Sequence, residues 1–361
     1  MEQINYKVSV TCLTFNHAEY IKDALNGFSI QQTDFPFVCC IVDDYSTDGE
    51  QDILKTYLSE HFDLSAPSTR KEETEDYQLV FSRHKENKNC FFAVFFLKYN
   101  HYKKKAKRPY MKEWLSNTKF HALCEGDDYW TDPLKLQKQV DFLEAHPDYT
   151  MVCNRTKLYS EKEHRAIGEN CCYNQSQTVS VKDAVCKGGL FISTCSIMYR
   201  SNLRDNYPDY CKKCMIGDYP LQIMAAMKGK IYYFNDMMSV YRVQNSMSWM
   251  GKLKWTQDTY DFRIATLRSI NKMFKGFAND YPQYADIFKT KIAHHISSFI
   301  PKRGNDPDIR KKYMKEFEDD IKEFSFLWKI DAWIGSSNIP LLARIRKWYY
   351  SPFKSNIKRY K

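Results

Sequence analysis

Glycine is scarce in this sequence, with 12 residues in a chain of 361. Neither a Gly-x-x-x-x-Gly-Lys phosphate loop nor a Gly-x-Gly-x-x-Gly turn is present. The first absence argues against P-loop nucleotide hydrolases, and the second argues against dinucleotide-dependent enzymes. The scarcity also argues against sugar nucleotidylyltransferases, which place a glycine-rich phosphate loop after their first strand.

Long apolar runs are lacking as well. None approaches the roughly 20 residues needed to span a bilayer, and residues 1–6 lead into an apolar strand without the pattern of a signal peptide. There are 12 cysteines, but a chain of this length can bury a large core without disulfides. We therefore expect reduced, mostly buried thiols and a cytoplasmic protein. Cys211 and Cys214 have zinc-type spacing, yet a second pair is missing, which favours ordinary thiols.

Positive charge is abundant, with a formal net charge of +10. This surplus favours anionic partners, such as nucleotides, nucleic acids, acidic glycans or lipid head groups, without choosing among them. Basic residues concentrate in residues 103–108 and 343–361. In the second segment, Leu342, Ile345, Trp348 and Tyr349 share a helical face. Such a helix either lies on an anionic membrane surface or packs on the rest of the protein.

Strand and helix patterns alternate along the first two-thirds of the chain. Apolar strands are predicted at 7–13 and 37–42, and each is followed by a helical pattern, at 21–30 and after Gly49. This order is typical of a parallel sheet with helical crossovers. Further strands are predicted at 78–82, 120–124, 149–153, 179–200 and 230–243, and a helix at 133–143. From about residue 255 the pattern is helical. We predict a catalytic α/β domain over 1–250 and a helical basic region over 251–361.

Two acidic clusters each follow a predicted strand directly. The clusters are Asp43-Asp44 and Glu125-Gly-Asp127-Asp128. Ligands of open α/β sheets bind at the carboxyl ends of the strands, so both clusters are expected to face one crevice. Neighbouring carboxylates repel each other unless a cation intervenes, and Mg²⁺ or Mn²⁺ accepts a few carboxylates plus substrate phosphates. The pattern thus predicts a site for a metal-bridged diphosphate. As an alternative, Asp43, Ser46 and Asp48 only cap a turn and the next helix.

Four segments occur in an order that is familiar from one enzyme family. They are VSVTCLTFNHAEYIKDAL, IVDDYSTDG, CEGDDYWTDPLKLQKQVDFLEAHPDY and the stretch that begins IGDYPLQIM and ends VYRVQNSMSW. Together they resemble the inverting family 2 glycosyltransferases of GT-A fold, particularly bacterial capsule and lipopolysaccharide enzymes. The resemblance covers residues 7–250. It implies a Rossmann-like, mainly parallel sheet flanked by helices, followed by a helical C-terminal region.

The resemblance implies roles for the ends of the first two strands. Thr14, Phe15 and Asn16 match the family's nucleotide-binding Thr-Tyr-Asn, with Phe15 against the base. Asp44 matches the residue that hydrogen-bonds a uracil-type base, and Asp43 is expected to support it. The proline that usually precedes the threonine is Leu13 here, a mild departure.

It also implies the metal ligands and the base. Glu125, Asp127 and Asp128 match an acidic motif whose first member is usually Asp; Glu125 and Asp127 are expected at the donor, and Asp127 and Asp128 at Mn²⁺ or Mg²⁺. Asp218 matches the catalytic base, which accepts the proton of the attacking hydroxyl. The alternative for Asp218 is an N-cap of the following helix. Gln244 stands where relatives often have His.

The implied function is transfer of a sugar from a nucleotide-diphosphate donor, with UDP-sugar the expectation, to a hydroxyl of a glycan or lipid-linked acceptor in surface polysaccharide synthesis. A lipid-linked acceptor is compatible with peripheral contact at the inner face of the membrane, and no nucleic-acid partner is expected. A non-catalytic protein that binds sugar nucleotides or nucleic acid is the alternative. Trp130 and Trp249 stack on a sugar or belong to the core, the core being the commoner place for tryptophan.

Overall fold

The computed structural model describes residues 4–102, 104–243, 257–298, 307–324, 326, 329 and 357–360. The predicted amphipathic helix near residue 345, together with Gln244 and Trp249, lies outside the described residues. Within them, no helix is both long and apolar enough to cross a membrane.

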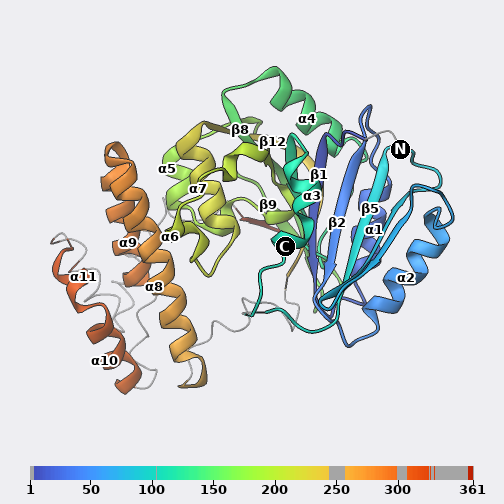
Figure 1. Ribbon diagram of the computed structural model, residues 1–361. Coiled ribbons are helices and arrows are strands. Elements are labelled where there is room, and N and C mark those ends of the chain that lie inside the picture. Colours follow the sequence, from blue (N-terminus) through green and yellow to red (C-terminus); the bar gives the residue numbers. More distant parts are fainter. Residues whose placement is uncertain are drawn as a thin grey trace.

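The centre of the protein is one mixed β-sheet (Figure 1). Its strands run in the order β10-β12-β8-β11-β6-β1-β2-β5-β4-β3. The pairs β1–β2, β1–β6 and β2–β5 are parallel, whereas β4 and β11 run antiparallel to their neighbours. The bounds of these strands are β1 Val8–Thr14, β2 Phe37–Asp43, β3 Arg70–Glu73, β4 Tyr77–Arg83, β5 Cys90–Leu97, β6 Phe120–Leu123, β8 Tyr149–Ser160, β10 Gln177–Val179, β11 Met198–Arg200 and β12 Lys230–Val243. The predicted α/β fold class is confirmed, with a sheet that is mixed.

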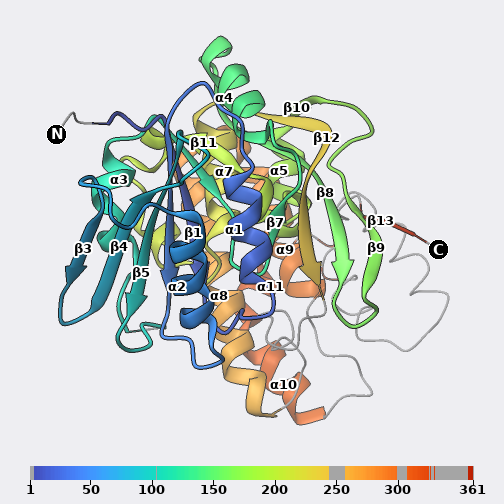
Figure 2. The same ribbon diagram turned by 90° about the vertical axis from the view of Figure 1, so that its right-hand side faces the viewer.

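Helices cover both faces of the sheet because its central strands are apolar on both sides. Every residue of β2 and β5 is buried. One face packs against α1 (Ile21–Ser29), α2 (Glu50–His61) and α4 (Lys135–Ala145), and Figure 2 shows α1 and α2 lying over it. The apolar side chains of α1 recur at helical spacing and are almost fully buried. On the opposite face, α3 (Lys112–Ser116) supplies Trp114 and Leu115 to a second cluster.

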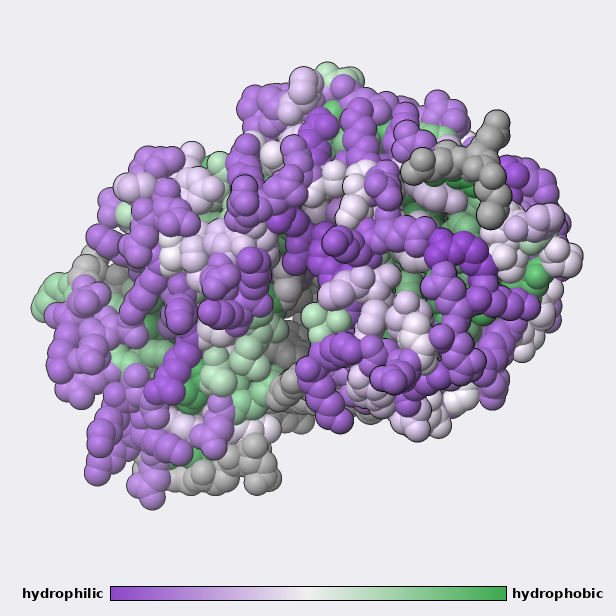
Figure 3. Space-filling view, in the orientation of Figure 1, coloured by the Kyte–Doolittle hydropathy of each residue, from purple (hydrophilic) through white to green (hydrophobic). Residues whose placement is uncertain are grey.

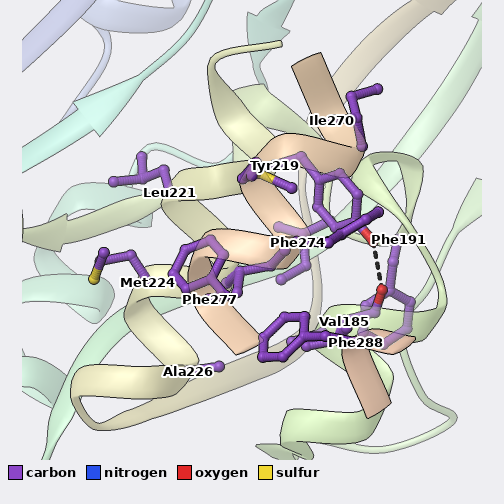
Figure 4. Packing of buried hydrophobic residues seen from close by; sticks show 14 of the residues in the cluster. Val185, Phe191, Tyr219, Leu221, Met224, Ala226, Ile270, Phe274, Phe277 and Phe288 are labelled. Carbon is purple, nitrogen blue, oxygen red and sulfur yellow. Dashed lines mark hydrogen bonds between the residues drawn. The ribbon is translucent and has the colours of Figure 1, made fainter. Parts of the chain in front are cut away.

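A third apolar core joins the later strands to the helices of the C-terminal region. It contains α5 (Val181–Cys186), α7 (Asp218–Lys228), α8 (Gln257–Asp280) and α9 (Ala285–Ser298). Phe274 and Phe277 of α8 meet Phe288 of α9 and Tyr219 of α7 in this core (Figure 4). The predicted boundary near residue 250 separates two stretches of the sequence, but side chains from both stretches pack into this one core.

One predicted strand is wrong. Residues 179–200 contain α5 and two single helical turns, Gly189–Phe191 and Thr194–Ser196, between the short strands β10 and β11. Ser180 begins α5, since its side chain accepts a hydrogen bond from the Asp183 amide. Gly188 has a φ of 86°, a conformation that glycine adopts without strain. The chain turns at this residue, so an extended strand does not continue through it.

Shorter elements complete the described chain. They are β7 Tyr129–Trp130, β9 Arg165–Asn170, α6 Asp209–Lys212, α10 Pro307–Glu316, α11 Glu318–Lys322 and β13 Ile357–Arg359. The last of them pairs with β9, which itself pairs with β8, so a C-terminal segment adds a strand to the sheet beside β9. Figure 3 shows a largely hydrophilic face with small apolar patches.

Candidate active site

The two acidic clusters lie at one edge of the sheet, on either side of β1. Asp43 ends β2 in register with Thr14 at the end of β1. On the other side, β6 runs parallel to β1 and leads into the turn that carries Glu125 to Asp128. The Asp44 amide donates to the Thr14 carbonyl at 3.0 Å, and the Gly126 amide donates to the Leu13 carbonyl at 3.0 Å. Parallel strand order thus brings Asp44 and Gly126, which are far apart in the sequence, to the end of β1.

Asp43 is a buried structural carboxylate. Its Oδ1 accepts hydrogen bonds from the Ser46 amide at 3.2 Å and from Gln51 Nε2 at 2.5 Å. Burial raises its pKa, and these hydrogen bonds oppose the rise. Asp48 Oδ1 accepts from the Glu50 amide at the start of α2. Asp43 and Asp48 thus both accept backbone amides near the start of α2, and Asp43 supports the turn that presents Asp44.

Asp44 is buried beneath the segment that follows β5. Its Oδ1 accepts from the His101 amide at 2.7 Å, and its Oδ2 pairs with Lys107 Nζ at 2.8 Å. Lys105, from the same basic run, pairs with Asp76. Lys105 and Lys107, two residues of the basic run 103–108, are thus held in ion pairs. The partner of Lys107 is Asp44, the carboxylate that is predicted to bind the base.

The loop after β1 is tied to the loop after β2. The Asn16 amide donates to Ser46 Oγ at 2.8 Å, and Asn16 Oδ1 accepts from the Thr47 amide at 2.8 Å. Asn16 has a φ of 55°, a left-handed conformation that asparagine tolerates. Phe15, beside it, is 36% exposed. Its ring is therefore accessible at the end of β1, as a base-stacking residue requires.

Thr14 belongs to an internal network centred on Glu50. The Thr14 hydroxyl donates to Glu50 Oε1, while Glu50 Oε2 accepts from the His17 amide at 2.9 Å and from Ser46 Oγ at 2.8 Å. Thr14 Oγ1 also lies 3.1 Å from His17 Nδ1. Glu50 is fully buried, so its carboxylate holds the ends of β1 and β2 together from below.

Arg242 fixes the acidic turn from β12. Its amide donates to Asp128 Oδ1 at 2.9 Å, and its guanidinium donates to the Asp127 carbonyl at 2.7 Å. The same guanidinium pairs with Asp23 at 2.5 Å and with Glu161 at 2.6 Å. Asp128 is 1% exposed, and among the described residues no hydrogen-bond partner reaches its Oδ2. Burial and the charge of Asp127 raise the pKa of Asp128.

Gly126 allows the acidic turn to lie against the end of β1. A Cβ at this position would stand 2.3 Å from Thr14 Oγ1 and 3.2 Å from His17 Nδ1. The side chain of Asp127, at 24% exposure, is the more accessible of the two predicted metal ligands, and its Oδ2 lies 4.0 Å from His17 Nε2. The close approach at Gly126 thus sets the position of Asp127 relative to His17.

Asp218 is the first residue of α7, and Gly217 is the N-cap. Its Oδ1 accepts from the Tyr219 amide at 2.8 Å, and its Oδ2 accepts from Thr194 Oγ1 at 3.1 Å. The carboxylate therefore does bond at the start of the helix, although it is not the N-cap that the alternative expected. Burial raises its pKa, and the bond from Thr194 opposes the rise. A carboxylate with a raised pKa is a stronger base.

Glu125 connects the donor-side turn with Asp218. Its pKa is raised to about 8, first by burial and then by the negative charges of Asp127 and Asp218, while Lys107 opposes the rise. Glu125 thus lies within electrostatic reach of both Asp127 and Asp218. A concentration of negative charge of this kind requires a cation, a proton or donors for stability.

Residues 9–207 match glycosyl transferase family 2. The chain belongs to this family. Uncharacterized proteins of Mycobacterium tuberculosis and Mycobacterium bovis are 32% identical over 235 residues, which is 65% of this chain. The chain spans only 58% of the length of these relatives.

A solved structure of Staphylococcus aureus TarS shows the same fold as this glycosyltransferase family member. Staphylococcus aureus TarS 1–349, in complex with UDP-GlcNAc, aligns with a TM-score of 0.57 at 16% identity, covering 96% of this chain and 89% of that one. A mannosyltransferase from Pyrobaculum calidifontis, in complex with GDP-Man and Mn²⁺, aligns less closely, with a TM-score of 0.48 at 13% identity, over 96% of this chain and 81% of that one.

Several residues of the site escaped the sequence analysis. His17, Glu50, Lys107, Thr194 and Arg242 each contact a predicted site residue. Arg242 has a sequence signal, because it lies in the VYRV block that carries the resemblance. Glu50 and Thr194 have none, since ordinary polar residues reach the site only through the fold.

Two other predictions concern side chains outside the site. Trp130 is buried, and its indole donates to the Cys195 carbonyl at 2.8 Å, so it belongs to the core. The cysteines are free, and all but Cys214 are buried. Across the described ranges, no group of three or more His, Cys, Asp or Glu residues forms a ready metal cage.

Proposed function

We propose that this protein is an inverting glycosyltransferase that uses a nucleoside diphosphate sugar, with UDP-sugar as the first candidate. The acceptor is a hydroxyl group of a glycan or of a lipid-linked saccharide, in the synthesis of a surface polysaccharide. One observation carries the proposal. Glu125 is close enough to both Asp127 and Asp218 for their charges to raise its pKa, so donor-side carboxylates and a candidate base share one site. The structure of TarS with UDP-GlcNAc, a protein of the same fold, supports testing UDP-sugars first.

The donor-side residues have distinct tasks in this proposal. Phe15, exposed at the end of β1, stacks on the base. Asp44 accepts a hydrogen bond from the base, and Asp43 holds the turn that carries Asp44. Because Lys107 now pairs with Asp44, donor binding exchanges part of that ion pair for contacts with the nucleotide.

The acidic turn fits a divalent cation that is completed by substrate. Asp127 has an accessible carboxylate, and Asp128 has a buried oxygen without a partner among the described residues. Since these residues do not form a complete cage, phosphate oxygens and water would supply the remaining ligands, as is usual for Mg²⁺. When bound, Mn²⁺ or Mg²⁺ neutralises negative charge on the leaving diphosphate.

Asp218 performs the proton transfer. Its carboxylate accepts the proton of the acceptor hydroxyl while the hydroxyl oxygen bonds to the anomeric carbon. The bond from that carbon to the diphosphate oxygen breaks on the opposite side, so the anomeric configuration inverts. Thr194 and the Tyr219 amide orient the carboxylate, and its raised pKa favours proton acceptance.

The first test is thermal stability with UDP, GDP, dTDP and CMP, each with and without Mn²⁺. A nucleotide that binds the folded state raises the melting temperature by mass action, as RT ln(1 + [L]/Kd). We expect one nucleoside diphosphate to stabilise the protein in a metal-dependent manner, and Asp127→Ala to remove the metal dependence. An absence of any shift across this panel would contradict the proposal.

A further inference from the structure

The imidazole of His17 lies between Thr14 and the acidic turn. Its Nδ1 is 3.1 Å from Thr14 Oγ1, and its Nε2 is 4.0 Å from Asp127 Oδ2. The ring is mostly buried, with 16% of the side chain exposed. His17 therefore presents one nitrogen to the protein interior and the other to the carboxylate that is proposed to hold the cation.

Hydrogen bonds around Glu50 define which ring nitrogen carries the proton. Glu50 accepts hydrogen bonds from the His17 amide, from Ser46 Oγ and from the Thr14 hydroxyl. Because the single hydroxyl proton of Thr14 is directed to Glu50, Thr14 Oγ1 is an acceptor toward His17. The proton of the neutral ring thus belongs on Nδ1, and Nε2 carries a lone pair.

A lone pair and a carboxylate oxygen that face each other repel unless a proton or a metal cation lies between them. Bonds from a divalent ion to its ligands are about 2.1 Å long, so two ligands of one ion lie roughly 3 to 4 Å apart. The 4.0 Å between Nε2 and Asp127 Oδ2 fits that spacing. Histidines that bind metals donate their other ring N–H to a neighbouring acceptor, which orients the ring. The chain from Glu50 through Thr14 to His17 has this arrangement.

We propose that His17 Nε2 is a ligand of the divalent cation, together with Asp127, and that this nitrogen ligand makes the site prefer Mn²⁺ to Mg²⁺. The inference rests on the proposed donor site and goes beyond it in naming the ligand and the metal. Mg²⁺ favours oxygen ligands in near-ideal octahedral geometry, whereas imidazole is a good ligand for first-row transition ions. Asp128, whose buried Oδ2 has no hydrogen-bond partner among the described residues, belongs to the same turn.

The experiment measures Mn²⁺ and Mg²⁺ affinity by titration calorimetry in the presence of saturating UDP, with free Mn²⁺ also followed by electron paramagnetic resonance. His17→Ala is expected to weaken Mn²⁺ binding by at least 10-fold and Mg²⁺ binding by much less. Thr14→Val removes the acceptor for Nδ1–H and is expected to weaken Mn²⁺ binding about 10- to 100-fold. Thr14→Ser keeps the hydroxyl and is expected to restore most of the Mn²⁺ binding that Thr14→Val loses. His146→Ala, at the exposed end of α4, controls for loss of a histidine elsewhere.

The outcomes separate this inference from the proposed function. If wild-type protein binds Mn²⁺ with UDP and His17→Ala binds both as well as the wild type does, the His17 inference is overturned and the donor site stands. Equal loss of Mn²⁺ and Mg²⁺ in His17→Ala overturns the metal preference and the nitrogen ligand with it. If wild-type protein binds no UDP in either metal, the proposed function fails first. Melting temperatures of each variant without ligand show whether it is folded.

Discussion

The donor side of the site and the candidate base are held in place by different means. On the donor side, hydrogen bonds and ion pairs join the ends of β1, β2 and β6, with Glu50 and Arg242 each bonding to several segments. Asp218 has one side-chain partner from another segment, Thr194. Its helix, α7, is positioned by packing, and Figure 4 shows the aromatic side chains of α8 and α9 that meet it.

This difference predicts how each side responds to substitution. A donor-side change that removes one polar partner leaves buried charges unpaired, so binding and stability are lost together. A change at Asp218 alone leaves the packing of α7 intact, because Tyr219 and its neighbours provide that packing. On the base side, a substitution can therefore abolish proton transfer without weakening nucleotide binding. On the donor side, a substitution that weakens nucleotide binding also destabilises the fold.

The largest expected effect comes from Asp218→Asn. The amide keeps the shape of the carboxylate but does not accept the proton, and general bases contribute about 10²- to 10⁴-fold. We expect kcat to fall in this range while the Kd for the stabilising nucleotide changes by less than about 3-fold. Asp209→Asn on α6, an exposed carboxylate paired with lysines, is the matched control. Unchanged transfer by Asp218→Asn would contradict the role of Asp218 as the base, whereas nucleotide binding without any transfer by the wild type would favour the non-catalytic alternative.

Arg242→Met tests the donor side directly. The substitution leaves Glu161 and the Asp127 carbonyl without their cationic partner in a mostly buried place. Breaking a buried pair in this manner costs about 3 to 5 kcal/mol. Denaturant unfolding measures the loss, and nucleotide binding is expected to weaken in parallel. Arg155→Met removes a more exposed pair with Glu169, so it should cost clearly less. Similar losses of unfolding free energy in the two variants would contradict the inference that Arg242 holds the donor side together.

The sequence predicts the donor side better than the base side, because the two sides are held in place by different means. Strands β1, β2 and β6 and the carboxylates after them are local features, visible as apolar runs that end in acidic residues. Parallel strand order then brings Asp44 and Glu125 to one edge, as predicted.

The surroundings of Asp218 depend on long-range packing. Thr194 lies in a helical turn where alternating apolar residues predicted a strand, and its bond to Asp218 spans 24 positions. The buried Glu50 is equally invisible in the sequence, because its partners Thr14 and His17 come from another loop. The site residues' roles and the boundary near residue 250 remain predictions.

Gly126→Ala tests how closely the acidic turn approaches β1. The new Cβ would meet Thr14 Oγ1 at 2.3 Å, so the turn or the strand end has to move. Overpacking of this kind costs about 1 to 3 kcal/mol, and we expect metal-dependent nucleotide binding to weaken as well. Gly217→Ala, beside Asp218, is the control, because its Cβ would meet nothing within 4 Å. Equal effects of the two alanines on nucleotide binding would contradict the close packing inferred at Gly126.

The smallest expected effect compares acid sensitivity in the two halves. Burial lowers the pKa of His295 in α9 to about 3 and that of His121 in β6 to about 4, from an unfolded value of 6.5. Between those values the unfolded chain binds more protons, so the stability is complete above about pH 6.5 and falls as the pH falls. His295→Gln should therefore reduce the loss of unfolding free energy between pH 6.5 and 4 by up to about 3 kcal/mol, measured by urea unfolding. His121→Gln should give a smaller reduction, because its pKa shift is smaller. A larger reduction for His121→Gln than for His295→Gln would locate the acid-labile packing in the sheet instead of in the helices that pack against α7.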